Sequence, residues 1–138
     1  TIEEKELEKK DLVLIAGGVG ITPLFSIIQD NISKNKKHNI ILFYASKTKE
    51  DIIFKKEIES IRSNLFKKVY ILSRETKKGN YEIGYFNKEI LTKYVKINNP
   101  KDYLFYICGP EAMKKSVLEI LRNIGVPKRN IHVESFFW

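Results

Sequence analysis

The stretch LVLIAGGVGITPLFSII, residues 12–28, joins five apolar residues to glycines at 17, 18 and 20, and then to apolar residues at helical spacing. It predicts a strand over 12–16, a turn, and a helix over 22–33, with Thr22 as N-cap and Pro23 as first helical residue. One glycine can close a turn. Three glycines indicate that a ligand approaches the backbone. Glycine has no β-carbon to block it, and the start of a helix presents positive N–H groups.

The apolar pattern along the rest of the chain alternates between short buried runs and helical spacing. Further strands are expected at 40–45, 68–73, 103–107 and 131–134, and a polar, glycine-rich loop at 74–85. Buried strands separated by helices require crossover connections, so we predict an α/β fold: a doubly wound, five-stranded parallel sheet flanked by helices. Ligands bind such sheets at the carboxyl ends of the strands.

Three more helices are expected between these strands. One begins at a capping box formed by Thr48 and Asp51 and places apolar residues at 54, 58, 61 and 65 on one face. A short helix is expected over 86–94, and a longer one from Pro110, as first helical residue, to a stop signal at Gly125 and Pro127.

Composition limits the function classes. The net charge of +8 indicates a solvating surface or a docking face for an acidic protein, and the scattered lysines lack the arginine and aromatic pattern of nucleic-acid binding. The single cysteine excludes an intramolecular disulfide, offers no paired-cysteine metal site, and favours a cytoplasmic or other reducing compartment. No run reaches the ~18 apolar residues of a membrane span, so we expect no membrane contact from this segment; tethering of a longer parent stays open.

The glycine turn alone leaves several ligands open, including none. GVGITP falls one residue short of the dinucleotide GxGxxG pattern, and it lacks the lysine of a P-loop. The strand over 40–45 is followed by Ser46 and Lys47 rather than by the acid of the usual dinucleotide fold. Cys108 ends the fourth expected strand, and a lone cysteine there is usually a small buried apolar residue. GGVGITP followed about 90 residues later by CGP is more specific than either motif alone.

Together these motifs resemble the C-terminal NAD(P)H-binding domain of the ferredoxin-NADP reductase superfamily, which includes NADH-cytochrome b5 reductases, oxygenase reductase components and flavohaemoglobins. The likeness covers nearly the whole chain in matching order. It comprises GGVGITP at 17–23, YASKTKEDIIFKKEIE at 44–59, LSRE at 72–75, GYFNKEIL at 84–91, YICGPEAM at 106–113 and HVESF at 132–136.

The resemblance implies a ligand for each turn. Gly17, Gly18 and Gly20, with Thr22, would hold the NAD(P)H pyrophosphate, and Cys108 and Gly109 would lie against the nicotinamide. Cys108 would be catalytic by positioning the nicotinamide carbon as hydride passes to the N5 atom of FAD. The predicted cofactor-binding set also contains Val19, Ile21, Pro23, Pro110 and Met113, and Phe136, which matches an aromatic residue that faces the flavin.

The resemblance also implies a missing half. The family's flavin-binding barrel, with its Arg-x-Tyr-Ser/Thr motif, has no counterpart here. We therefore expect residues 1–10 to be an interdomain remnant, 11–138 to be the NAD(P)H-binding domain, and the FAD-binding domain to belong to the same parent protein. Electrons would continue from FAD to a one-electron acceptor, for which an acidic protein is a candidate. The alternatives are a non-catalytic NAD(P)-binding or sensing module, and a scaffold without ligand.

Residues at the second and third expected strand ends bear on the choice of nicotinamide. Lys47 and Arg74 suit the 2′-phosphate of NADPH, and Ser73 with Arg74 resembles the pair in phosphate-binding members. Asp51 corresponds to an acid near the adenosine ribose in NADH-using cytochrome b5 reductases, although its capping box needs no ligand. With Ser46 these residues form the predicted adenosine end. NADH is favoured, and NADPH stays open.

Overall fold

The chain is described by a computed structural model over residues 10–34, 38–76 and 79–134. The expected interdomain remnant, apart from Lys10, and the predicted flavin-facing Phe136 lie outside the described residues.

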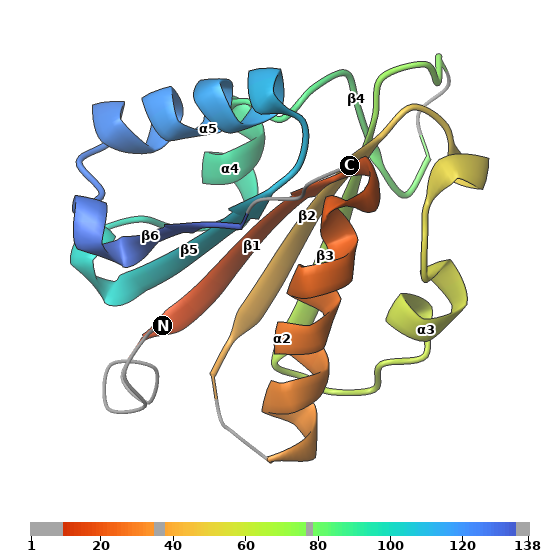
Figure 1. The fold of residues 1–138 in the computed structure, drawn as a ribbon, viewed down its shortest axis with the longest axis horizontal. Coiled ribbons are helices and arrows are strands. Elements are labelled where there is room, and N and C mark those ends of the chain that lie inside the picture. Colours follow the sequence, from red (N-terminus) through yellow and green to blue (C-terminus); the bar gives the residue numbers. More distant parts are fainter. Residues whose placement is uncertain (1–9, 35–37, 77–78, 135–138) are drawn as a thin grey trace.

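The structure is built on one parallel sheet (Figure 1). Its strands are β1 (Asp11–Gly17), β2 (Ile40–Ser46), β3 (Phe66–Leu72), β4 (Glu82–Ile83), β5 (Tyr103–Cys108) and β6 (Ile131–Val133), in the order β4-β3-β2-β1-β5-β6. The chain runs outward from β1 through β4 and then returns to the other side of β1 with β5. That reversal of strand order is the switch point where ligands bind in such sheets. The doubly wound α/β class is confirmed; the expected count of five strands was one short.

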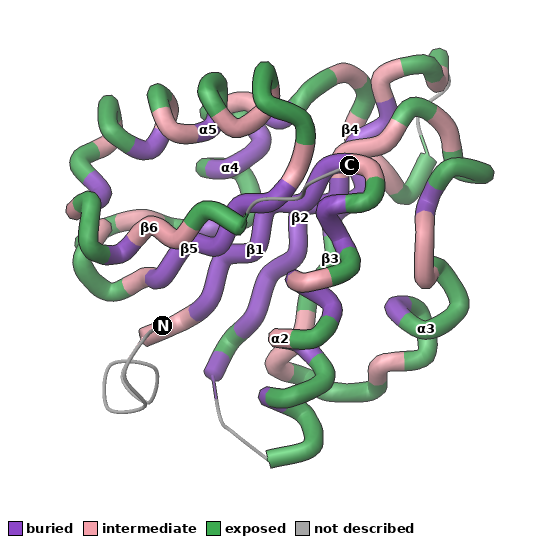
Figure 2. The backbone as a smooth tube through the Cα atoms, in the orientation of Figure 1, coloured by how far each residue is buried: buried purple, intermediate pink, exposed green. Residues whose placement is uncertain are grey.

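Two helices cover each face of the sheet (Figure 1). On one face α2 (Ile21–Ser33) and α3 (Lys55–Glu59) pack against a cluster that contains Leu12, Leu14 and Ala16. On the other face α4 (Lys88–Tyr94) and α5 (Glu111–Asn123) pack against Val13 and Ile15. Alternate residues of β1 therefore enter two cores, and the central strands are buried along most of their length (Figure 2). The described residues also contain short 3₁₀ helices at Gly18–Gly20, Lys49–Asp51, Pro100–Asp102 and Lys128–Asn130.

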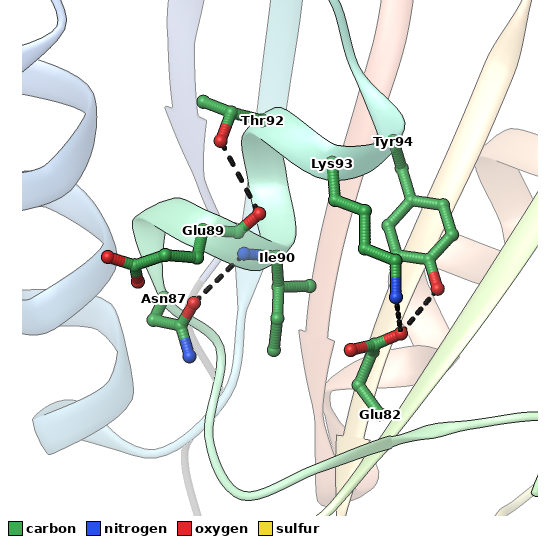
Figure 3. A network of polar contacts seen from close by, with 7 residues as sticks. All are labelled: Glu82, Asn87, Glu89, Ile90, Thr92, Lys93 and Tyr94. Carbon is green, nitrogen blue, oxygen red and sulfur yellow. Dashed lines mark hydrogen bonds and ion pairs between the residues drawn. The ribbon is translucent and has the colours of Figure 1, made fainter.

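The strand that the sequence missed, β4, lies in the expected 74–85 loop. Its two residues pair with Ile71 and Leu72 of β3. The Glu82 carboxylate accepts hydrogen bonds from Lys93 Nζ at 2.8 Å and from the Tyr94 hydroxyl, both on α4 (Figure 3). A strand of two residues has no alternation to detect, so only the pairing and this contact reveal it.

The helix expected from Thr48 through residue 65 was wrong. The capping box is present, but it opens only the 3₁₀ turn Lys49–Asp51. Ile52 is then extended and Phe54 adopts a left-handed backbone with φ of 60°, which restricts α3 to five residues. The Phe54 ring stacks on Phe25 of α2 with centroids 4.8 Å apart. Tertiary packing of this ring accompanies a conformation that the apolar spacing did not indicate.

Helix ends shift by one or two residues from the predictions. Gly20 is the N-cap of α2, so Thr22 and Pro23 are the second and third helical residues rather than N-cap and first. Pro110 is the N-cap of α5 rather than its first helical residue, so the helix begins one residue later than predicted. Proline fits the first turn at either place because its missing N–H has no helical acceptor there. The stop at Gly125 is confirmed: its φ is +88°, its N–H donates to Arg122, and that of Val126 donates to Leu121.

Candidate functional site

The turn at residues 17–20, called the first turn, and the turn at residues 108–110, called the second turn, are in contact. Ala16 of β1 pairs with Cys108 of β5, so the strands end side by side. A β-carbon on Gly20 would collide with the Cys108 carbonyl group and would lie 2.9 Å from the Gly109 nitrogen. Gly20 therefore has a packing requirement of its own, because any side chain there would force the two turns apart.

Met113 completes this contact from the first turn of α5. A β-carbon on Gly17 would lie 2.5 Å from the Met113 sulfur and 3.1 Å from Cδ of Pro110. One on Gly109 would lie 2.5 Å from Met113 Cε and 3.1 Å from the Gly17 nitrogen. The structure thus brings together four residues that the sequence predicted for the cofactor, namely Gly17, Gly109, Pro110 and Met113.

Gly18 is the glycine of the first turn that packing does not explain. Its φ is +55°, and apart from its chain neighbours no atom of the described residues lies within 4 Å of the position a β-carbon would take. Val19 beside it is 44% exposed. Ile21 is buried, Thr22 is exposed and Pro23 is half-buried. This side of the turn is open to a ligand.

The start of α2 adds positive character to the same place. The helix has 13 residues, no side chain caps its N-terminus, and its first turn contains no acidic residue. The Ile21 N–H donates to the Val19 carbonyl and Pro23 has no N–H, so the positive character at this place comes from the helix dipole and from the remaining backbone donors of the turn. With the open turn at Gly18, the arrangement can bind a phosphate group through backbone donors.

Cys108 is fully buried within the core on the α2 face. Burial raises the pKa of its thiol above the ordinary 9.0; Glu134 raises it further, and Lys114 opposes the shift. The group is therefore a thiol at neutral pH and a poor nucleophile. Any contribution of Cys108 to catalysis would therefore come from positioning a bound group rather than from nucleophilic attack.

The predicted adenosine end is gathered at the adjacent strand ends. The Ser46 carbonyl accepts from the Ser73 N–H at 3.0 Å, and the Lys47 carbonyl accepts from the Arg74 N–H at 2.9 Å. The side chains of Lys47 and Arg74 belong to exposed residues. The carboxylate of Asp51 accepts the Thr48 N–H at 3.2 Å and the Thr48 hydroxyl at 2.7 Å through the same oxygen. All five predicted residues lie at the carboxyl edge of β2 and β3.

Tyr44 is a site residue that the sequence reasoning missed. It is fully buried near the end of β2, and its hydroxyl donates to the Gly18 carbonyl at 2.8 Å. The same hydroxyl accepts from the Ile53 N–H at 3.1 Å. Burial raises the pKa of this tyrosine above its ordinary value. The sequence signal that could have indicated Tyr44 was its hydroxyl group within a run of apolar residues, two residues before the strand ends.

A cavity lies away from these residues. It has a volume of about 440 Å³ between α3 and β3, where Lys55 and Glu59 face Lys68 and Tyr70. None of the predicted site residues lines it. Within residues 10–34, 38–76 and 79–134 there is no cluster of three metal-ligating side chains. No helix in those ranges has the length and apolar character needed to cross a membrane.

Comparisons with known proteins agree with this geometry. The family model described as "Oxidoreductase NAD-binding domain" matches residues 14–119. NADH-cytochrome b5 reductase 2 of Scheffersomyces stipitis is 37% identical over 113 residues, which cover 78% of this chain and 37% of that protein. Flavohemoprotein A of Dictyostelium discoideum is 30% identical over 131 residues, which cover 95% of this chain and 32% of that protein. The chain thus spans about a third of each of these relatives.

A solved structure supports the fold in the same way. The CS-b5R domains of human Ncb5or, in the NAD⁺ form, align with a TM-score of 0.84 over 98% of this chain and 39% of that one. At 24% identity this likeness concerns the fold alone.

Proposed function

The chain belongs to the oxidoreductase NAD-binding domain family, and from that premise we propose that it is the NAD(P)H-binding domain of a longer flavin-dependent reductase. Residues 11–138 would form this domain, residues 1–10 would lead into it, and an FAD-binding domain of the same parent would supply the other half of the active site. The relatives it matches include an NADH-cytochrome b5 reductase and a flavohemoprotein, of which it covers about a third.

One observation carries the proposal: the open, left-handed Gly18 lies at an uncapped helix start, directly beside the end of the strand that carries Cys108. A pyrophosphate fits this place because backbone N–H groups and the helix dipole both favour negative charge, and because among residues 10–34, 38–76 and 79–134 no side chain lies within 4 Å of the position of a Gly18 β-carbon. Gly17 and Gly20 contribute by keeping the two turns together, as their packing contacts require.

The nicotinamide would extend from this pyrophosphate toward the β5 end. There the Gly109 backbone, Pro110 and Met113 form the surface of the second turn, and Cys108 supports it from the core. Bound NAD(P)H would supply a hydride to the flavin of the partner domain, which would release electrons one at a time to an acceptor. The net charge of +8 suits an acidic acceptor protein.

The adenosine end favours NADH. Asp51 and Glu75 both contribute carboxylates there, and Glu75 accepts a hydrogen bond from the Lys49 N–H at 3.4 Å. Carboxylates near the ribose suit a free 2′-hydroxyl and repel a 2′-phosphate. The exposed Lys47 and Arg74 are the basis for NADPH as the alternative.

Nucleotide titration of the chain tests the proposal. We expect NADH to bind, Gly18→Val to weaken that binding at least about tenfold by blocking the backbone approach, and Gly125→Val to leave it unchanged. Gly125 is the matched control because it too has positive φ, +88°, and open surroundings. Both variants therefore place a valine on a backbone with positive φ. Equal affinities in the two variants, or no binding by the wild type, would refute the assignment.

The complete burial of Cys108 favours one other candidate, a non-catalytic NAD(P)-binding or sensing module in which the thiol serves packing alone. The longer parent distinguishes the two. A reductase contains bound flavin that NADH reduces, whereas a sensing module binds the nucleotide without oxidising it.

A further inference from the structure

Tyr44 connects the glycine turn to the segment that follows the capping box. Its side chain rises from β2 on the α2 face, and it reaches Gly18 in one direction and Ile53 in the other. These two contacts span 35 residues of sequence, from the end of β1 to the start of α3. A single buried hydroxyl thus fixes two segments of the candidate site.

The hydrogen bond from the Ile53 N–H determines where the Tyr44 hydroxyl directs its own proton. A tyrosine hydroxyl has one proton to donate. Because it accepts the Ile53 N–H at 3.1 Å, its own proton is directed to the Gly18 carbonyl at 2.8 Å. Ile53 is itself held in place, since the next residue, Phe54, stacks on Phe25 of α2.

The bond to Gly18 fixes more than the carbonyl. In a trans peptide the C=O of one residue and the N–H of the next point in opposite directions, and none of the described peptide bonds is cis. With the Gly18 carbonyl turned inward to the buried Tyr44, the N–H of Val19 points away from the core. Val19 is itself 44% exposed, and among the described residues none but the chain neighbours of Gly18 lies within 4 Å of the position of a Gly18 β-carbon.

We propose that Tyr44 is a positioning residue for nucleotide binding: its hydroxyl orients the Gly18–Val19 peptide so that the Val19 N–H donates to the pyrophosphate. This inference rests on the proposed function and adds to it the residue that prepares the phosphate-binding turn before the ligand arrives. Preorganised donors bind better because they lose little conformational freedom on binding.

The neighbouring tyrosine provides a matched control. Tyr70 pairs with Tyr44 in the β2–β3 register, packs in the same core, and is also buried. Its hydroxyl, however, has no hydrogen-bond partner within residues 10–34, 38–76 and 79–134. Tyr44→Phe and Tyr70→Phe remove the same atom from adjacent places, but only the first releases the glycine turn.

The experiment titrates the full chain with ADP-ribose, which has the pyrophosphate but no nicotinamide, and follows both affinity and the Val19 amide resonance. We expect Tyr44→Phe to bind about tenfold more weakly than wild type, with a reduced ligand-induced shift of the Val19 amide. Tyr70→Phe should match the wild type in both. A tyrosine with a purely structural role would lower thermal stability without this selective change at Val19.

The outcomes separate the two claims. If the wild type fails to bind ADP-ribose, the proposed function is overturned, and the role of Tyr44 with it. If the wild type binds and Tyr44→Phe keeps both the affinity and the Val19 shift, the site stands and the positioning role is refuted. If Tyr44→Phe does not fold, the wild-type spectra provide the test. A Val19 amide resonance that does not shift with ADP-ribose, while amide resonances of other residues of 17–23 do, also refutes the positioning role of Tyr44.

Discussion

Gly20 at the start of α2 lies directly against the backbone of Cys108 at the end of β5. A β-carbon on Gly20 would overlap the Cys108 carbonyl, whereas one on Gly18, two residues earlier, would meet no atom within 4 Å among the described residues beyond its chain neighbours. The two glycines of one short turn therefore serve different purposes. Gly20 joins the first turn to the second, and Gly18 leaves the outer side of the turn open.

This difference predicts different costs for the same substitution. Gly20→Ala should lower the free energy of unfolding by about 3 kcal/mol, because backbone atoms of β5 must move. Gly18→Ala should cost about 1 kcal/mol, from its left-handed backbone alone. Urea unfolding of the two variants measures both values. A loss for Gly20→Ala no larger than that for Gly18→Ala would contradict the packing role.

Cys108 should affect the rate of hydride transfer more than nucleotide binding. In the proposed full-length reductase we expect Cys108→Ala to slow flavin reduction about tenfold by displacing the nicotinamide, with the NADH dissociation constant changed less than about twofold. Rapid-mixing absorbance of the flavin gives the rate, and titration gives the affinity. Equal losses in both would indicate that the buried thiol serves packing only.

Asp51 has two explanations that a pair of variants can separate. If its carboxylate recognises the ribose, Asp51→Asn should weaken NADH relative to NADPH by about fivefold, since a repulsive charge is removed from the 2′ position. Thr48→Val removes the hydroxyl that donates to Asp51 but keeps the carboxylate. It should leave the preference unchanged. Tenfold tighter binding of NADPH than NADH by the wild type would itself show that Asp51 is misassigned.

Stability should fall at alkaline pH. Burial raises the pKa of Cys108 above its ordinary 9.0, and burial raises that of Tyr106 from 10.0 to about 12. Tyr70 shifts upward for the same main reason. The folded chain then holds protons that the unfolded chain releases, so the stabilisation is complete below the ordinary values and is lost as pH rises toward the folded ones.

The unfolding free energy should therefore begin to decline near the ordinary thiol value of 9.0 and fall more steeply above the ordinary tyrosine value of 10.0. Urea unfolding at about pH 8, 9.5 and 10.5 measures this decline. Cys108→Ala should remove the earlier part of it. A stability that stays constant over this range would show that these groups ionise freely in the folded chain.

The sequence predicted the parts of the fold that repeat over many residues. The buried runs of β1, β2 and β5 and the apolar face of α5 have clear periods, and each lies within two residues of its expected position. Features set by contacts between distant residues were missed. β4 pairs with the end of β3, and its Glu82 contacts Lys93 and Tyr94. α3 begins only after the left-handed Phe54, whose ring stacks on Phe25.

The same division applies to the candidate site. Residues next to a glycine or at a strand end could be predicted, because parallel strands bring their carboxyl ends to one edge. Tyr44 could not, because its role depends on a hydroxyl that reaches Gly18, 26 residues away in sequence. The separate purposes of Gly18 and Gly20 were equally hidden, since identical residues differ only in which atoms surround them.

By itself, then, the sequence determined the doubly wound class, the edge of the sheet where the candidate site lies, and the family, through GGVGITP, CGP and the strands that place them. Only the tertiary structure decided which glycine is open among the described residues, that the thiol is buried, and that a buried tyrosine hydroxyl donates to the Gly18 carbonyl. The physical reason is the range of the interactions. Hydrophobic period and backbone propensity act along neighbouring residues, whereas close approach and hydrogen bonding within a core depend on strands that meet only after the chain has folded.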